Sequence, residues 1–203
     1  SRLSVLGALY GDGDTAQAAA SAHELAALTG TSRQAAPTLS ETWVADACVV
    51  AQWRLSRNDT SGVSEIIGSL RSYGGPQPVG IAGASGPACA ALLDGWRAVT
   101  TRGRAARTVL AHLDSLVFTP LIAGDLASYA PLLLAHLHER VGDDALARRA
   151  LERRAVMLGW PRYQASILLH DARLASRAGD VAAARAADDR YLALRGETNP
   201  SRP

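Results

Sequence analysis

Two stretches of the sequence, GDDALARRALERRAVMLG at residues 142–159 and GDVAAARAADDRYLALRG at residues 179–196, decide the fold because they repeat one pattern. In both, Ala stands three, five and eight positions after the first Gly. The pattern recurs from Gly13 and, more weakly, from Asn58 and Gly103. Successive starting points lie 45, 45, 39 and 37 residues apart, which is the length of a helix-turn-helix unit with a variable connection.

The residue types at the start of each copy predict a reversal between two helices. A residue in the left-handed conformation closes the end of a helix, and Gly adopts this conformation most easily, with Asn as the usual substitute. The Asp that follows in most copies accepts hydrogen bonds from the first amides of the next helix. The small residues allow that helix to lie close to its partner. We therefore expect the chain to reverse near Asn58, Gly103, Gly142 and Gly179.

Composition favours an all-α protein. The 203 residues include 40 Ala, 27 Leu and 21 Arg, which are all strong helix formers. No segment alternates in the way a half-buried strand does, so no sheet is expected. Helices are predicted over 41–57, 87–101, 125–141 and 143–158. The net charge is +2 and there is no Lys, which excludes P-loop, kinase and Schiff-base chemistry.

The domain prediction is a single helical array over residues 1–197 with an extended tail at 198–203. Residues 74–86 carry five Gly and two Pro and form the longest predicted break, a flexible loop inside the array. The sequence begins with a helix-like stretch and no signal segment, so we expect a piece of a longer polypeptide.

The spacing of small residues resembles that of tetratricopeptide repeats. The positions that carry the resemblance are pairs of a turn Gly and a small residue five positions later, together with small residues seven positions before the turn: Gly13/Ala18, Gly142/Ala147 and Gly179/Ala184, with Ala51, Ala135 and Ala172. Residues 173–195 further resemble the C-terminal helical region of bacterial serine/threonine kinases and of transcriptional regulators with a bacterial transcriptional activation domain.

The resemblance implies an α-solenoid of about five antiparallel helical hairpins. It also implies a non-catalytic scaffold or sensor module that binds a protein or peptide, or another domain of its parent chain, in bacterial signalling or transcription regulation. We expect a cytoplasmic location, no membrane contact, no direct nucleic-acid contact, no cofactor and no catalytic residue. The predicted partner surface is the concave face lined by the first helix of each hairpin.

Candidate partner-binding residues are aromatic or cationic. Trp43 and Trp53 lie on one predicted helix, about 80° apart around its axis, so one of them could face a groove. Arg148, Arg149 and Arg153 form a basic cluster that suits an acidic partner, although a solvated helix face is the commoner role of such a cluster.

Candidate residues for redox or metal chemistry are few. Cys48 and Cys89 are expected to be buried free thiols on separate helices. His136 and His138 invite a metal hypothesis, but residues two apart point about 200° apart on a helix, so we expect no metal site there. His170 is expected to be isolated.

Two alternative functions stay open at this point. Gly80, Gly83 and Gly86 precede Pro87, where free amides could hold an anion, so the 74–86 loop could belong to a small-molecule or anion sensor. A hydrolase would need a Ser-His-Asp or Cys-His constellation, and the sequence shows no nucleophile elbow.

Overall fold

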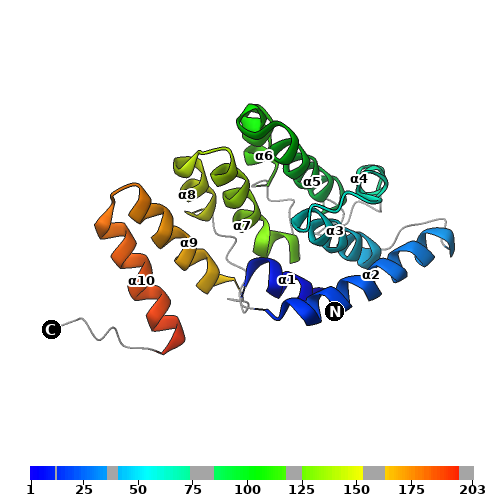
Figure 1. Ribbon diagram of the computed structural model, residues 1–203, viewed down its shortest axis with the longest axis horizontal. Helices are drawn as coiled ribbons and strands as arrows, with labels where there is room; N and C mark the ends of the chain where they lie inside the picture. The colour runs from blue at the N-terminus through cyan, green and yellow to red at the C-terminus, as the bar shows by residue number, and fades with distance from the viewer. Residues whose placement is uncertain (12, 36–40, 74–84, 118–124, 153–162, 197–203) are drawn as a thin grey trace, which may run out of the picture.

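The structure is a computed structural model, and it shows an all-α protein (Figure 1). It describes all residues except 12, 36–40, 74–84, 118–124, 153–162 and 197–203. The described part contains no strand. The α-helices are α1 (Arg2–Tyr10), α2 (Thr15–Ala35), α3 (Glu41–Ser56), α4 (Val63–Arg71), α5 (Ser85–Arg102), α6 (Arg107–Val117), α7 (Asp125–Arg140), α8 (Asp144–Glu152), α9 (Gln164–Arg177) and α10 (Val181–Arg195).

The predicted reversals are confirmed at the level of the backbone. Asn58, Gly103, Gly142 and Gly179 have φ values of 58°, 52°, 76° and 75°, which is the left-handed region. After Gly142 and Gly179, the amide of the next residue donates a hydrogen bond to a carbonyl oxygen of the preceding helix, and the N–O distance is 2.9 Å in both cases. These bonds satisfy carbonyls that the end of a helix leaves open.

The aspartates after these glycines start the following helices as predicted. The Asp143 carboxylate accepts from the Leu146 amide at 3.2 Å, and the Asp180 carboxylate accepts from the Ala183 amide at 3.1 Å. One short segment therefore ends one helix and begins the next.

The first and third copies of the pattern differ from the prediction. Gly13 is not left-handed; a Cβ atom there would lie 2.6 Å from the Ala8 amide nitrogen and from the Gly7 carbonyl carbon, so close backbone approach requires the glycine. Gly103 opens a 3₁₀ turn, η1 (Gly103–Ala106), before α6 begins.

Helices adjacent in sequence pack against each other from α1 through α10. In addition α1 contacts α3, α3 contacts α5, and α5 contacts α7, so alternate helices form an inner row. The row bends until α1 also touches α7, and Figure 1 shows α1 on the inside of the resulting arc. Only some of the small residues of the repeat pattern are buried: Ala18, Ala51, Ala135, Ala147 and Ala172. Ala184 is partly buried, and the Ala three positions after each Gly, at 16, 145 and 182, is exposed.

The centre of the inner row is filled by a buried polar and aromatic cluster. The Tyr10 and Tyr129 rings stack with their centroids 5.1 Å apart, and Tyr163 meets Tyr10 edge-on at 6.2 Å. Gln52 accepts a hydrogen bond from the Tyr10 hydroxyl and donates to the Tyr129 hydroxyl at 3.0 Å. Around Tyr10 and Tyr129, buried side chains therefore fill the space between the helices of the inner row, where a peptide groove was predicted.

The expectation of free thiols is wrong. Cys48 on α3 and Cys89 on α5 form a disulfide, with their Cα atoms 6.1 Å apart. The two helices are neighbours in the inner row, and both cysteines face their contact. Because the two cysteines are 41 residues apart in sequence, their spacing alone did not indicate that they lie close together.

Some predictions lie outside the described residues: most of the 74–86 loop, the tail at 198–203 and the end of the helix predicted over 143–158. Within the described part, none of the helices combines the length and the apolar character that crossing a membrane demands.

Candidate functional site

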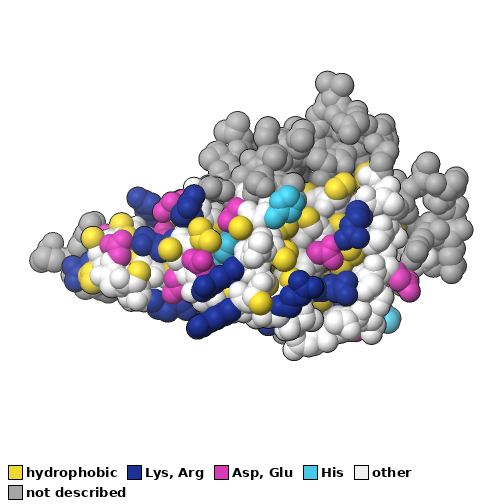
Figure 2. Space-filling view, turned by 90° about the horizontal axis from the view of Figure 1, so that it is seen from above, with side chains coloured by type: hydrophobic (Ala, Val, Ile, Leu, Met, Phe, Trp, Pro, Cys, Tyr) yellow, Lys and Arg dark blue, Asp and Glu magenta, His cyan; other side chains and the backbone are white. Residues whose placement is uncertain are grey.

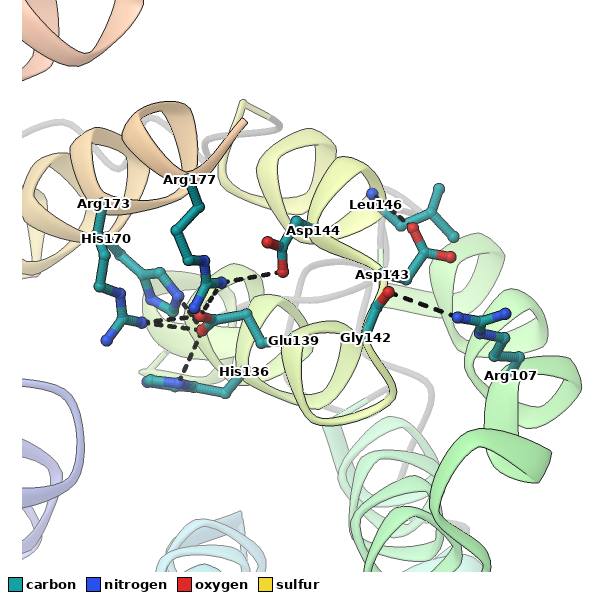
Figure 3. A network of polar contacts seen from close by, with 10 residues as sticks. All are labelled: Arg107, His136, Glu139, Gly142, Asp143, Asp144, Leu146, His170, Arg173 and Arg177. Carbon is teal, nitrogen blue, oxygen red and sulfur yellow. Dashed lines mark hydrogen bonds and ion pairs between the residues drawn. The ribbon is translucent and has the colours of Figure 1, made fainter. Parts of the chain in front are cut away.

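Glu139, in the last turn of α7, is the centre of a polar network that joins α7 to α9 (Figure 3). Its carboxylate accepts hydrogen bonds from Arg173 at 3.0 Å to each oxygen and from Arg177 at 2.5 Å. His170 Nε2 contacts the Oε2 atom of the same carboxylate. Arg177 also donates to Asp144 at the start of α8, at 2.9 Å. The Glu139 carboxylate thus joins α7 to α9, and Arg177 extends the network to α8.

A second set of ion pairs continues the junction. Arg148 on α8 lies 3.4 Å from the Asp171 carboxylate on α9 and 3.3 Å from the Asp180 carboxylate that caps α10. Figure 2 shows Arg side chains interspersed with acidic ones over the narrow end of the molecule that α9 and α10 form. We call the contacts of Glu139 and Arg148 with α9 and α10 the polar junction.

Burial and charge set the protonation states at Glu139. Burial lowers the pKa of His136 to about 4, and the neighbouring His170 contributes to the same shift. Burial also lowers the pKa of His170, against the opposing effect of Glu139. For Glu139, burial raises the pKa of the carboxyl, but His170 and Arg177 outweigh it and the pKa is lowered. At neutral pH the network therefore contains a neutral His136 imidazole and an ionised Glu139 carboxylate.

His136, Glu139 and His170 bring three potential metal ligands together. One ligand atom from each lies within 4.8 Å of the other two. The His136 Nδ1 atom is 3.7 Å from Glu139 Oε2, the oxygen that His170 Nε2 also contacts. The two imidazole rings are tilted by 50° with centroids 4.6 Å apart. Neutral imidazoles and a carboxylate are the usual nitrogen and oxygen ligands of Zn²⁺.

Sequence reasoning compared the wrong histidines. His136 and His138 do point to different sides of α7, because His138 is buried with its Nε2 atom 3.4 Å from the Asp114 carboxylate. The partner of His136 is His170, 34 residues later and on another helix. The three-residue spacing of His136 and Glu139 on one helix was the available signal, since such residues face the same side.

A cavity of about 230 Å³ opens next to this cluster, where α1, α3, α5 and α7 meet. Its lining is mainly apolar with cationic or neutral polar groups, and contains no acidic residue: Leu9, Tyr10, Ser56, Trp96, Leu133, His136, Leu137 and Arg140. His136 belongs to both the cavity and the ligand cluster. Among the described residues, Trp96 Nε1 is a buried donor without a hydrogen-bond partner.

The two tryptophans predicted as partner contacts occupy different environments. Trp43 is buried, and its indole N–H donates to the Thr29 carbonyl at 3.0 Å, so it holds α3 against α2. Trp53 is half-buried against the core, with the Arg57 guanidinium 4.6 Å from its ring centroid. Trp43 thus has a packing role, and a partner contact of Trp53 stays a prediction.

The predicted basic cluster does not act as a unit. Arg148 is half-buried and engaged in the polar junction, whereas Arg149 is exposed. Arg153 lies outside the described residues. An acidic partner at these arginines stays a prediction, and Arg149 is its one accessible described member.

Comparisons of the chain with protein families, with curated proteins and with solved structures find no match. The resemblance to tetratricopeptide repeats and to regions of bacterial kinases and regulators therefore stays a prediction.

Proposed function

We propose that the chain is a non-catalytic interaction module, a tetratricopeptide-like α-solenoid of a larger bacterial signalling or transcription-regulatory protein. Its partner inserts an apolar side chain, flanked by a carboxylate, into the cavity between α1, α3, α5 and α7. The observation that carries the proposal is the lining of this cavity: apolar walls with Arg140 and His136 and no acidic group.

The backbone supports the repeat architecture. Helices reverse through left-handed residues at four of the predicted positions, and alternate helices form an inner row. Stacked two-helix units bury their apolar faces on each other in this way. Because α1 contacts α7, the array is too tightly curved to leave an open groove along its inner face. The cavity between α1, α3, α5 and α7 is then the part of this face that a partner could reach.

The volume of the cavity favours a single anchoring side chain. Small-molecule sites usually measure about 300–1,000 Å³, and this cavity of about 230 Å³ is smaller. Buried aromatic or aliphatic anchors dominate the affinity of many protein interfaces. The exposed guanidinium of Arg140 then favours a partner whose anchor is followed by Asp, Glu or a C-terminal carboxylate.

The disulfide bears on where the module works. Disulfides persist in oxidising compartments and are rare in reducing ones. Cys48 and Cys89 therefore favour exposure of this region to an oxidising environment, and the cytoplasmic location expected above stays a prediction that this bond weighs against.

The sensor and hydrolase alternatives stay predictions. The sensor alternative rests on the 74–86 loop, of which residues 74–84 are outside the described part. That the module is not an enzyme and needs no cofactor stays a prediction.

Fluorescence anisotropy with short labelled peptides tests the proposal. The peptides carry Leu, Phe or Trp followed by Glu, and a matched set carries Lys instead of Glu. We expect the Glu set to bind at least about tenfold more tightly, and Arg140→Glu to remove this preference. Arg185→Glu is the matched control, because Arg185 is an exposed arginine on α10 outside the cavity lining. Equal binding of the two sets, or equal effects of the two variants, would contradict the proposal.

A further inference from the structure

The side chains of His136, Glu139 and His170 converge on one point between α7 and α9 (Figure 3). A single oxygen, Glu139 Oε2, faces the Nδ1 atom of His136 and the Nε2 atom of His170. The arrangement does not depend on the cavity as a partner site, because Glu139 and His170 do not line it.

We propose that His136, Glu139 and His170 bind a divalent transition-metal ion of the Zn²⁺ class. Two imidazoles and one carboxylate are a ligand set that Zn²⁺ accepts, and three protein ligands leave a further position for water or another donor. Mg²⁺ and Ca²⁺ prefer oxygen ligands only, so the two histidines select against these ions.

The helices already hold the ligands close to the required separations. His136 and Glu139 are three residues apart on α7, so they lie on the same face of one helix. His170 comes from the middle of α9, and its side chain is only 5% exposed, which fixes its ring. A bound ion would replace the direct contact between His170 and Glu139 by two metal–ligand bonds.

The two arginines that contact Glu139 would affect a bound ion in different ways. Arg177 donates to Glu139 Oε1 and to Asp144, so it can keep orienting the carboxylate while Oε2 binds the metal. Such outer contacts fix the orientation of metal-bound carboxylates. Arg173 contacts both oxygens and is 55% exposed, so it must release Oε2 but is free to swing into solvent.

An ion at this point would connect α7 to α9 through metal–ligand bonds, across the polar junction. The junction is otherwise held by hydrogen bonds and ion pairs. Metal binding would therefore tie the α9–α10 hairpin to the rest of the chain more strongly than the side-chain contacts do.

Isothermal titration of the untagged, EDTA-treated and dialysed chain with ZnCl₂ tests the proposal, and absorbance of a Co²⁺ titration reports the coordination. We expect one ion per chain and a Co²⁺ spectrum of nitrogen and oxygen ligands. His170→Gln and His136→Gln should each weaken Zn²⁺ binding by more than about tenfold. His23→Gln, which changes an exposed histidine on α2, is the matched control and should leave binding unchanged.

A further variant distinguishes a metal site from a chance grouping of the three side chains. Arg173→Gln removes the competing cation without removing a ligand, so we expect Zn²⁺ to bind about threefold more tightly or better. If His170→Gln does not fold, His136→Gln decides, because the His136 side chain is 46% exposed and its replacement disturbs the packing less than that of His170. Absence of binding, or equal loss in the His23→Gln variant, would overturn the proposal.

Discussion

The inner row of helices and the α9–α10 hairpin belong to one repeated pattern in the sequence but are joined to their neighbours in different ways. In the inner row, α1, α3, α5 and α7 meet through a continuous apolar core, a disulfide and the Tyr10–Gln52–Tyr129 cluster. The hairpin joins the rest of the chain through the polar junction and through Ile167 and Leu174 of α9, which belong to the same core. Its other buried apolar side chains, Leu168, Ala172, Ala175 and Ala187, are not part of that continuous core.

The difference shows that the repeat pattern encodes turns and close helix pairs, but not how one pair docks on the next. Apolar docking is insensitive to ions and fixes the geometry. Charged docking at a partly exposed surface depends on ionic strength and on bound ions. We therefore expect the inner row to be the more rigid region, and the α9–α10 hairpin to respond more to ionic strength and to bound ions.

Removing the disulfide gives the largest expected effect. The bond closes a loop with a sequence separation of 41, for which the loss of chain entropy corresponds to about 4 kcal/mol. The double variant Cys48→Ala/Cys89→Ala should lose about that much free energy of unfolding in urea, measured by circular dichroism. An unchanged unfolding midpoint would mean that the α3–α5 contact does not need the bond.

Overpacking compares the α9–α10 hairpin with the apolar core, to which Ala147 of α8 belongs, at equivalent positions of the repeat. Ala147 and Ala184 each stand five residues after a left-handed glycine, but Ala147 is fully buried and Ala184 is half-exposed. Ala147→Leu should cost about 1–3 kcal/mol of unfolding free energy and Ala184→Leu less than about 0.5 kcal/mol. Equal costs in thermal unfolding would remove the distinction between core and hairpin.

Alkaline pH should weaken the inner row. Burial, together with Tyr129 and Tyr163, raises the pKa of Tyr10 well above its ordinary value of 10.0. Above pH 10 the unfolded chain loses this proton and the folded chain keeps it, so stability falls as pH rises from 10 toward the raised pKa. The slope is about 1.4 kcal/mol per pH unit for one group. Urea unfolding at rising pH should show this loss, and Tyr10→Phe should reduce it; the same slope in that variant would contradict the assignment.

Neutralising Glu139 should loosen the hairpin with a smaller effect on total stability. Glu139→Gln keeps the shape but removes the charge that Arg173 and Arg177 share, which we expect to cost about 1 kcal/mol because both arginines are partly exposed. The experiment uses a Trp160→Phe background, in which the remaining tryptophans, Trp43, Trp53 and Trp96, lie on α3 and α5. Fluorescence then follows the inner row, while circular dichroism follows all helices. The two signals should separate during urea unfolding of the variant; coincident curves would contradict a separately loosened hairpin.

Much of the fold followed from the sequence because it rests on local physics. The all-α class, the bounds of α3, α5 and α7 within two residues and the left-handed reversals come from helix propensity and turn chemistry. The Cys48–Cys89 bond and the meeting of His136 with His170 did not follow, since both depend on which helix faces come together in space. The burial of Trp43 likewise depends on the α2–α3 contact.

Hydrogen–deuterium exchange with and without Zn²⁺ tests the contrast between the two regions most directly. Without the ion, we expect faster exchange of the amides of α9 and α10 than of those of α3 and α5. Adding Zn²⁺ should slow exchange in α9 and in the last turn of α7 and leave α3 and α5 unchanged. Uniform exchange along the chain, or protection by Zn²⁺ away from His136, Glu139 and His170, would contradict it.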